Sequence, residues 1–311
     1  MMKDAATHTG PGIGGLLAAV ASPVDKDMGC DNQLLENRCR YLLQAGCDGL
    51  ALFGTTGEGP LFHANQRIAA LNHLVAAGIA PSQILVSASA MTLPDIARLG
   101  RHATDIGSAG VLLMPPFFFR ERISDDGVFR FYAAAIEQIA RPDLKLLLYH
   151  FPAMSGVPIN PDLVRRLMER FPGTIVGIKD SGGDWDFTDT LLTRFSDLSI
   201  FTGTEVDVPR LLAAGGAGTI CGLANVIPIL MRRMFDAPTF SARRRFIPLI
   251  HSIDAIMSRG PFICCLKTMI AAETGQADWL RMAPPLIPLP AYKRKQIIDD
   301  FRQFETACVD V

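Results

Sequence analysis

The chain has 311 residues, of which 49% are hydrophobic and 20% are charged, and its formal net charge at pH 7 is -1. A chain of this size can bury a large core without disulfides or a structural metal. The near-zero net charge gives no electrostatic reason to expect nucleic acid or an anionic membrane as a partner. No apolar run approaches the roughly 20 residues that span a bilayer. Seven cysteines, mostly in apolar settings, are typical of a reducing cytoplasm, so we expect a cytoplasmic protein.

Residues 1–12 are small and polar and predict a disordered tail. From there to about residue 227, short apolar runs rich in β-branched residues alternate with helical stretches. Eight such runs begin near Ile13, Gly49, Ile84, Gly110, Leu144, Thr174, Leu198 and Gly218. The helical stretches include residues 32–44, 64–77, 95–106, 128–139 and 161–170. Strand-helix alternation indicates a parallel sheet, and eight units of this length predict a (β/α)8 TIM barrel over residues 13–227.

Residues 228–311 no longer alternate and predict helices only. The expected helices cover residues 239–258, interrupted at Pro248, then 261–273 and 291–306. A proline-rich stretch at residues 282–288 predicts a stiff connector before the last helix. We therefore expect a C-terminal helical extension that forms a second, smaller domain.

Polar side chains follow three of the predicted strands. Lys179 ends the sixth, Tyr149 ends the fifth, and Thr55 follows the second. A lysine at the end of a strand is more often a solvated terminus than a catalytic group. In a TIM barrel, however, the carboxyl ends of all strands meet on one face, which carries the active site. The joint occurrence of the three side chains therefore favours an active site.

These residue types suit the chemistry of a ketone. A lysine amine can form an iminium with a ketone carbon, and the iminium accepts an electron pair far better than the carbonyl does. Lys179 is the predicted nucleophile, recessed at the barrel mouth beside Phe118 and Tyr149. We expect Tyr149 to transfer protons with help from Thr55.

The turn after the second strand suits a carboxylate. Gly54, Thr55 and Thr56 offer hydroxyls and closely approachable backbone N–H groups. Glu58, in the same segment, is either a base or a support for the turn, and we favour the supporting role. The histidines lack ligand spacing to Cys, Asp or Glu, so we expect no metal and no cofactor.

Three motifs carry a family resemblance: Gly54-Thr55-Thr56-Gly57-Glu58, Tyr149 before Phe151-Pro152, and Gly177-Ile178-Lys179-Asp180-Ser181. They resemble the signature set of the dihydrodipicolinate synthase/N-acetylneuraminate lyase family. The resemblance runs in order from Ile13 to about Pro288 and includes Gly203 and Gly222 after the last two strands. It implies a TIM barrel with a helical C-terminal domain and a Schiff-base lysine acting on 2-keto acids such as pyruvate. It also implies a homo-oligomer, a dimer or tetramer and usually a tetramer.

Two departures from the family pattern narrow the expected substrate. True dihydrodipicolinate synthases place an arginine five residues after the tyrosine, where it grips the carboxylate of the incoming aldehyde, and here that residue is Met154. They also carry a tyrosine pair after the fourth strand, where this chain has phenylalanines that include Phe118. We therefore expect negligible condensation of pyruvate with aspartate semialdehyde.

The stretch from Tyr149 to Gly156 resembles the sialic acid lyases and sugar-acid aldolases more closely, with His150 where asparagine is more usual. The positions that bind the sialic acid tail match only in part, through Thr204, Glu205 and Gly222. We favour a 2-keto-3-deoxy sugar-acid aldolase that releases pyruvate. A sugar-acid dehydratase, a true dihydrodipicolinate synthase, an N-acetylneuraminate lyase and a non-catalytic sugar-acid binding protein stay open as alternatives.

Overall fold

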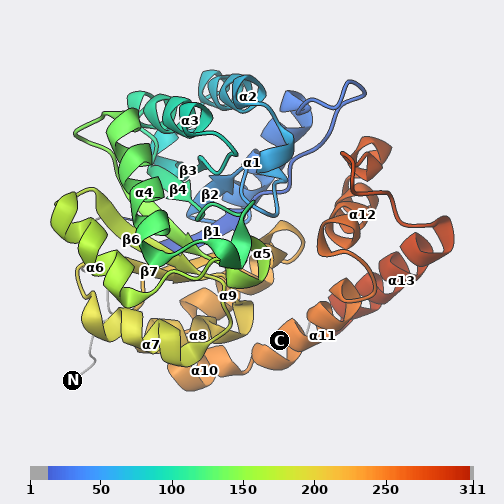
Figure 1. Cartoon of the computed structure of the whole chain (residues 1–311). Helices are drawn as coiled ribbons and strands as arrows, with labels where there is room; N and C mark the ends of the chain where they lie inside the picture. Colours follow the sequence, from blue (N-terminus) through green and yellow to red (C-terminus); the bar gives the residue numbers. More distant parts are fainter. Residues whose placement is uncertain (1–12, 309–311) are drawn as a thin grey trace.

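The computed structural model describes residues 13–308, so the tail expected at residues 1–12 lies outside the described part of the chain. Eight parallel strands close into a barrel in the order in which they occur in the sequence, which confirms the TIM barrel (Figure 1). Each strand begins within two residues of its predicted start. The strands are β1 (Gly15–Ala19), β2 (Gly49–Leu52), β3 (Ile84–Ser87), β4 (Gly110–Leu113), β5 (Leu146–His150), β6 (Ile175–Asp180), β7 (Ser199–Thr202) and β8 (Gly218–Cys221).

The strands are buried on both faces because their side chains alternate between two apolar layers. Leu17, Leu147 and Phe201 belong to the cluster that fills the barrel interior. Their strand neighbours, such as Leu16 and Ile200, pack in the larger cluster between the strands and the surrounding helices. This double burial explains why the strands read as continuous apolar runs in the sequence.

Helices cover the outside of the barrel (Figure 1). The barrel helices up to β8 are α1 (Asn32–Gln44), α2 (Ala64–Ala76), α3 (Leu93–Asp105), α4 (Asp125–Ile139), α5 (Pro152–Ser155), α6 (Pro161–Arg170), α7 (Trp185–Arg194) and α8 (Val208–Ala213). Side-chain caps fix several of their starts: Asp31 accepts from the Leu34 amide at 3.0 Å, and Asn160 accepts from the Leu163 amide at 2.8 Å.

The chain ends in helices α9 (Pro228–Asp236), α10 (Phe240–Arg244), α11 (Ile247–Met257), α12 (Phe262–Thr274) and α13 (Ala291–Ala307). The interruption expected at Pro248 falls instead at residues 245–246, and Pro248 lies in the first turn of α11. Proline is tolerated there because the first turn has no intrahelical partner for its N–H. Helix α9 contacts β1, whereas α12 and α13 stand beside the barrel in Figure 1. A domain boundary at residue 227 stays a prediction.

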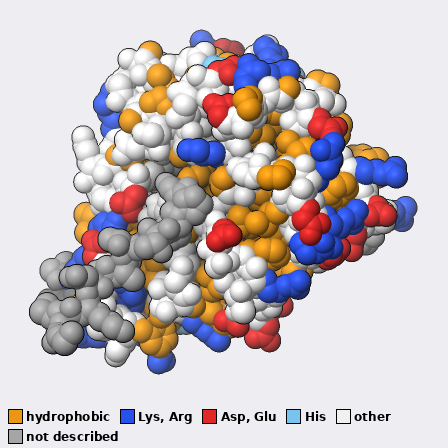
Figure 2. All heavy atoms as spheres, turned by 90° about the vertical axis from the view of Figure 1, so that its left-hand side faces the viewer, with side chains coloured by type: hydrophobic (Ala, Val, Ile, Leu, Met, Phe, Trp, Pro, Cys, Tyr) orange, Lys and Arg blue, Asp and Glu red, His pale blue; other side chains and the backbone are white. Residues whose placement is uncertain are grey.

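Surface charge is mixed. On the face shown in Figure 2, acidic and basic side chains lie among apolar patches, and charges of one sign do not gather in a large area. Among the helices within residues 13–308, none alone is long and apolar enough to cross a membrane. A pair bent by 101°, residues 240–257 with 262–274, meets that test of length and composition only when taken together.

Candidate active site

The register between β5 and β6 places Tyr149 directly beside Lys179. Both side chains are buried, with 2% and 5% of their surface exposed. Neighbouring residues such as Ile178 point to the helices, so alternation along the strand directs Lys179 toward the barrel interior. Two strand ends therefore bring an amine and a phenol together in an apolar setting.

A short hydrogen-bond chain joins the three predicted catalytic residues. Lys179 Nζ donates to the Tyr149 hydroxyl at 3.3 Å and lies 4.3 Å from the centroid of the tyrosine ring. The Tyr149 hydroxyl shares a second hydrogen bond, of 3.0 Å, with Thr55 Oγ1. Within residues 13–308, Lys179 forms no ion pair with a carboxylate. The chain can thus pass a proton between the amine, the phenol and the threonine.

The Gly54–Glu58 segment is a tight turn between two residues with left-handed backbones, Phe53 at φ 58° and Glu58 at φ 52°. The Glu58 amide donates to the Thr55 carbonyl and the Gly59 amide to the Gly54 carbonyl, both at 3.1 Å. A side chain at Gly59 would collide with the Phe53 carbonyl, so this turn requires glycine there. The two hydrogen bonds therefore hold Thr55 and Thr56 within one closed turn.

A cavity of about 430 Å³ opens above Lys179. Most of the residues predicted for the site line it: Thr55, Thr56, Tyr149, Met154, Lys179, Gly203, Glu205 and Gly222. A side chain at Gly203 would lie 3.2 Å from Lys179 Cε, and one at Gly222 would lie 2.7 Å from the ring of Phe262. Both glycines therefore keep space open next to the site.

Two predicted residues are placed differently. Gly54 precedes the two threonines but does not line the cavity. Phe118 lies on the loop after β4 with 69% of its surface exposed, in edge-to-face contact with Phe119. Within the described chain it contributes nothing to the apolar surroundings expected for Lys179. A substrate-binding role for either residue stays a prediction.

The C-terminal helices contribute cavity residues that sequence reasoning missed. Asp254 comes from α11, and Phe262 and Ile263 come from the start of α12. Nothing in their local sequence marks them, because they reach the cavity only through the way in which the helices pack. Ser181 also lines the cavity and was foreseeable, since it follows Lys179 by two residues.

Two acidic side chains, Glu205 and Asp254, line the part of the cavity that is formed by residues beyond the strand ends, here called the outer end. Burial raises the pKa of Glu205 to about 7, although the Leu223 amide donates to its Oε1 at 3.0 Å and Asp254 also contributes to the rise. Burial likewise raises the pKa of Asp254. Apart from Lys179, the described lining residues include no lysine, arginine or histidine. The outer end is therefore poor in sites for a second anionic group.

His150, next to Tyr149, faces away from the cavity. Its Nδ1 accepts a hydrogen bond from the Ile159 amide at 3.0 Å, and its ring lies 4.3 Å from that of Phe187. Burial lowers the pKa of His150. These contacts require a neutral ring that holds the loop after β5 in place.

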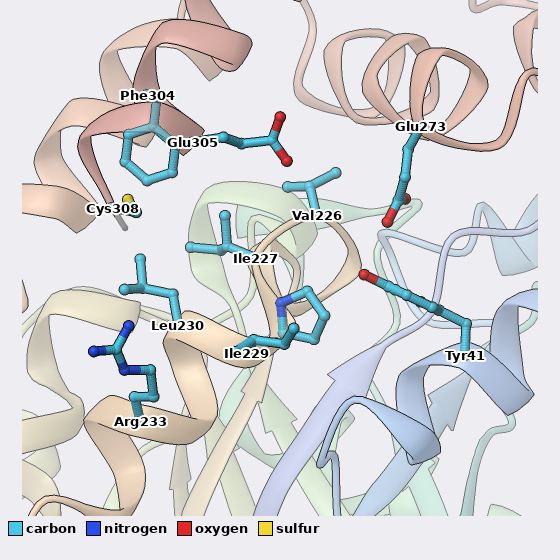
Figure 3. Close-up of a pocket in the computed structure, with 11 residues that line it drawn as sticks. Tyr41, Val226, Ile227, Ile229, Leu230, Arg233, Glu273, Phe304, Glu305 and Cys308 are labelled. Atoms are coloured by element: carbon cyan, nitrogen blue, oxygen red, sulfur yellow. The ribbon is translucent and has the colours of Figure 1, made fainter. Parts of the chain in front are cut away.

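A second cavity, of about 310 Å³, lies between α1, α9, α12 and α13 (Figure 3). The Tyr41 hydroxyl and the Glu273 carboxylate point toward each other at one side of it (Figure 3). Burial raises the pKa of Tyr41 to about 12, which is the wrong direction for an activated phenol. Among the described residues, the second cavity shares no lining residue with the first. No group of three metal-ligating side chains exists among the residues that the structure describes.

Comparisons with known proteins agree with this geometry. The model of the Dihydrodipicolinate synthetase family matches residues 12–303. A protein described as an uncharacterized DapA-like lyase from Chloroflexus aurantiacus is 33% identical over 72% of this chain and 74% of its own. The crystal structure of dihydrodipicolinate synthase from Agrobacterium tumefaciens is 33% identical, with a TM-score of 0.85 over 93% of this chain and 99% of that one.

A 2-keto-3-deoxygluconate aldolase from Sulfolobus solfataricus shares the fold alone, with a TM-score of 0.85 at 18% identity over 95% of this chain and 98% of that one. The family match covers nearly the whole described chain and includes every residue that lines the Lys179 cavity. The chain is therefore a lyase that belongs to the dihydrodipicolinate synthetase family.

Proposed function

We propose that this lyase forms a Schiff base between Lys179 and a 2-keto acid, and that it cleaves a 2-keto-3-deoxy sugar acid to pyruvate and an aldehyde. The observation that carries the proposal is the hydrogen-bonded chain of Lys179, Tyr149 and Thr55 at the base of the cavity. It supplies a nucleophile, a proton carrier and a hydroxyl relay at adjacent strand ends.

The first step is imine formation. The neutral Lys179 amine adds to the ketone carbon; the adduct takes one proton from the Tyr149 hydroxyl and loses one water, which leaves an iminium at Nζ and a phenolate at Tyr149. The substrate carboxylate lies at the Thr55–Thr56 turn, whose two amide N–H groups donate to no other atom among the described residues. Such amides and the adjacent hydroxyls are suitable donors for a carboxylate.

Cleavage then uses the iminium as an electron sink. Tyr149 accepts the proton of the C4 hydroxyl, the C3–C4 bond breaks, and its electron pair forms an enamine while the aldehyde leaves. The enamine takes up a proton at C3. Addition of water to the resulting iminium releases pyruvate and restores Lys179. Thr55 completes the proton relay through its 3.0 Å contact with Tyr149.

The outer end of the cavity supports an uncharged, hydroxylated tail on the substrate. Glu205 and Asp254 can form hydrogen bonds with hydroxyl groups, and in their ionised form they repel phosphate or carboxylate. Met154 offers apolar surface and only a weak acceptor at the position where a synthase would carry arginine. Condensation with aspartate semialdehyde is therefore disfavoured, although the Agrobacterium tumefaciens relative is described as a dihydrodipicolinate synthase.

We also propose that the protein acts in the cytoplasm as a homo-oligomer. Phe118 and Phe119 are 69% and 65% exposed, and adjacent exposed aromatic rings are typical of protein interfaces. Light scattering of the purified protein measures the assembly; a monomer would contradict this part of the proposal.

Product analysis on a panel of 2-keto-3-deoxy acids tests the function. We expect pyruvate and an aldehyde in equal amounts. A dehydratase would instead remove the C3 proton, lose the C4 hydroxyl as water and give a deoxy semialdehyde without pyruvate. Binding without any product, with unchanged affinity in Lys179→Ala, would favour a sugar-acid binding protein and contradict the proposal.

A further inference from the structure

A buried ion pair lies behind the threonine turn. Lys267 of α12 contacts the Glu58 carboxylate, and the side chains of the two residues are 0% and 1% exposed. Within the described chain, neither group has a hydrogen-bond partner apart from the other. Buried ion pairs are often no more stable than apolar side chains of the same volume. Stability alone is therefore a weak reason for this pair.

Glu58 is rigidly connected to the residues that meet the substrate. Its backbone is left-handed, and its amide donates to the Thr55 carbonyl at 3.1 Å. A second bond of 3.1 Å, from Gly59 to Gly54, closes the same turn. Any movement of Glu58 toward or away from Lys267 would therefore shift Thr55 and Thr56.

Lys267 is connected to the other side of the cavity. Phe262 and Ile263, at the start of α12, line the cavity, and Lys267 lies on the same helix about one turn further along. The first residues of α12 thus line the outer end of the cavity, and Lys267 of the same helix pairs with Glu58 of the threonine turn.

Glu58 itself is unsuited to act as the base. It does not line the Lys179 cavity, and its carboxylate is paired with Lys267. Burial raises the pKa of Glu58, and Lys267 opposes the rise. An unpaired carboxylate at this depth would have to take up a proton or move toward water.

We propose that Lys267 is a positioning residue: through Glu58 it holds the Gly54–Glu58 turn in the geometry that selects a 2-keto acid for its carboxylate. The inference rests on the proposed function, because it concerns the carboxylate of a substrate bound to Lys179. It assigns to α12, within the C-terminal extension, a role in the barrel's own chemistry.

The test compares pyruvate with pyruvamide, which has nearly the same shape but no negative charge. Borohydride trapping at Lys179, followed by peptide mass mapping, gives the rate of adduct formation for each compound. The wild type should prefer pyruvate by roughly tenfold to hundredfold, the value of a charge-assisted contact. In Lys267→Met this preference should fall about tenfold, while trapping of pyruvamide changes little.

Lys295→Met is the matched control, because Lys295 pairs with Asp299 on α13 at an 80% exposed position and should leave the preference unchanged. Glu58→Gln/Lys267→Met removes both buried charges and keeps the test available where Lys267→Met fails to fold. In the double variant, the preference for pyruvate should also be about tenfold lower than in the wild type. A preference for pyruvate equal to that of the wild type, in either Lys267→Met or the double variant, would overturn the inference. A wild type without a Lys179 adduct would instead overturn the proposed function.

Discussion

The two ends of the Lys179 cavity differ in origin and in charge. The inner end is built from strand ends, where Lys179, Tyr149 and Thr55 form one buried hydrogen-bond chain. The outer end combines Glu205, from the loop after β7, with Asp254 and Phe262 from the C-terminal helices. In the proposed function, the barrel supplies the bond chemistry, and the extension helps to select the tail of the substrate.

A shared lysine and tyrosine at strand ends indicate an iminium mechanism, but they say little about the partner aldehyde. In the proposed function, substrate choice depends on other residues that line the cavity, such as Met154 and Asp254. Variants at the inner end should therefore abolish turnover, and variants at the outer end should change preference.

The largest effect is expected for Lys179→Ala. Loss of the nucleophile removes the iminium route, and cleavage of the preferred 2-keto-3-deoxy acid should fall by about 10⁴-fold or more in kcat. Steady-state assays measure this, with Lys145→Ala as a control at an exposed position just before β5. Activity within tenfold of the wild type would place the chemistry elsewhere.

Tyr149→Phe should follow, with a loss of roughly 10²- to 10⁴-fold in kcat, because a positioned acid-base group contributes that much. Imine formation should survive better than cleavage, since Lys179 is still present. Single-turnover trapping compared with product release separates the two steps. Tyr292→Phe, at a 67% exposed site, is the matched control. An equal loss in both steps would show that Tyr149 only supports the fold.

Met154 should produce a smaller, selective effect. We expect kcat/KM for pyruvate with aspartate semialdehyde far below about 10⁴ M⁻¹s⁻¹, the low end of ordinary enzymes. Met154→Arg should raise it by about tenfold, the lower end for a charge-assisted contact, because the side chain at this position is exposed. A wild-type value within tenfold of 10⁴ M⁻¹s⁻¹ would refute the use of Met154 to set the substrate.

Glu205 should give the smallest effect, visible as a dependence of stability on pH. Its pKa rises from 4.5 to about 7 on folding, chiefly through burial, so the folded state holds the proton more tightly than the unfolded state. The stabilisation that comes from this tighter proton binding is fully present below pH 4.5 and is lost as the pH rises through 7. The melting temperature of the wild type should therefore fall relative to Glu205→Gln between pH 5 and 8. A constant difference across that range would contradict the assignment.

The convergence of Lys179, Tyr149 and Thr55 could be predicted from the sequence, because the hydrophobic period and the strand ends determine it, whereas their catalytic roles stay a prediction. Once eight strands were recognised, Lys179 and Tyr149 had to end neighbouring strands on the same face. The outer end depends on how separate helices pack, so Asp254 and Phe262 carried no local signal. Phe118 was expected beside Lys179, but its side chain is exposed, because the position of a residue along a loop does not determine where its side chain points.

The most direct test of the central claim is borohydride reduction of the wild-type protein in the presence of pyruvate, followed by intact mass measurement and peptide mapping. The amine of Lys179 lies 3.3 Å from the Tyr149 hydroxyl inside the cavity, so we expect one reduced pyruvate adduct per chain, located on Lys179. No adduct, or an adduct on another lysine, would contradict the Schiff-base account.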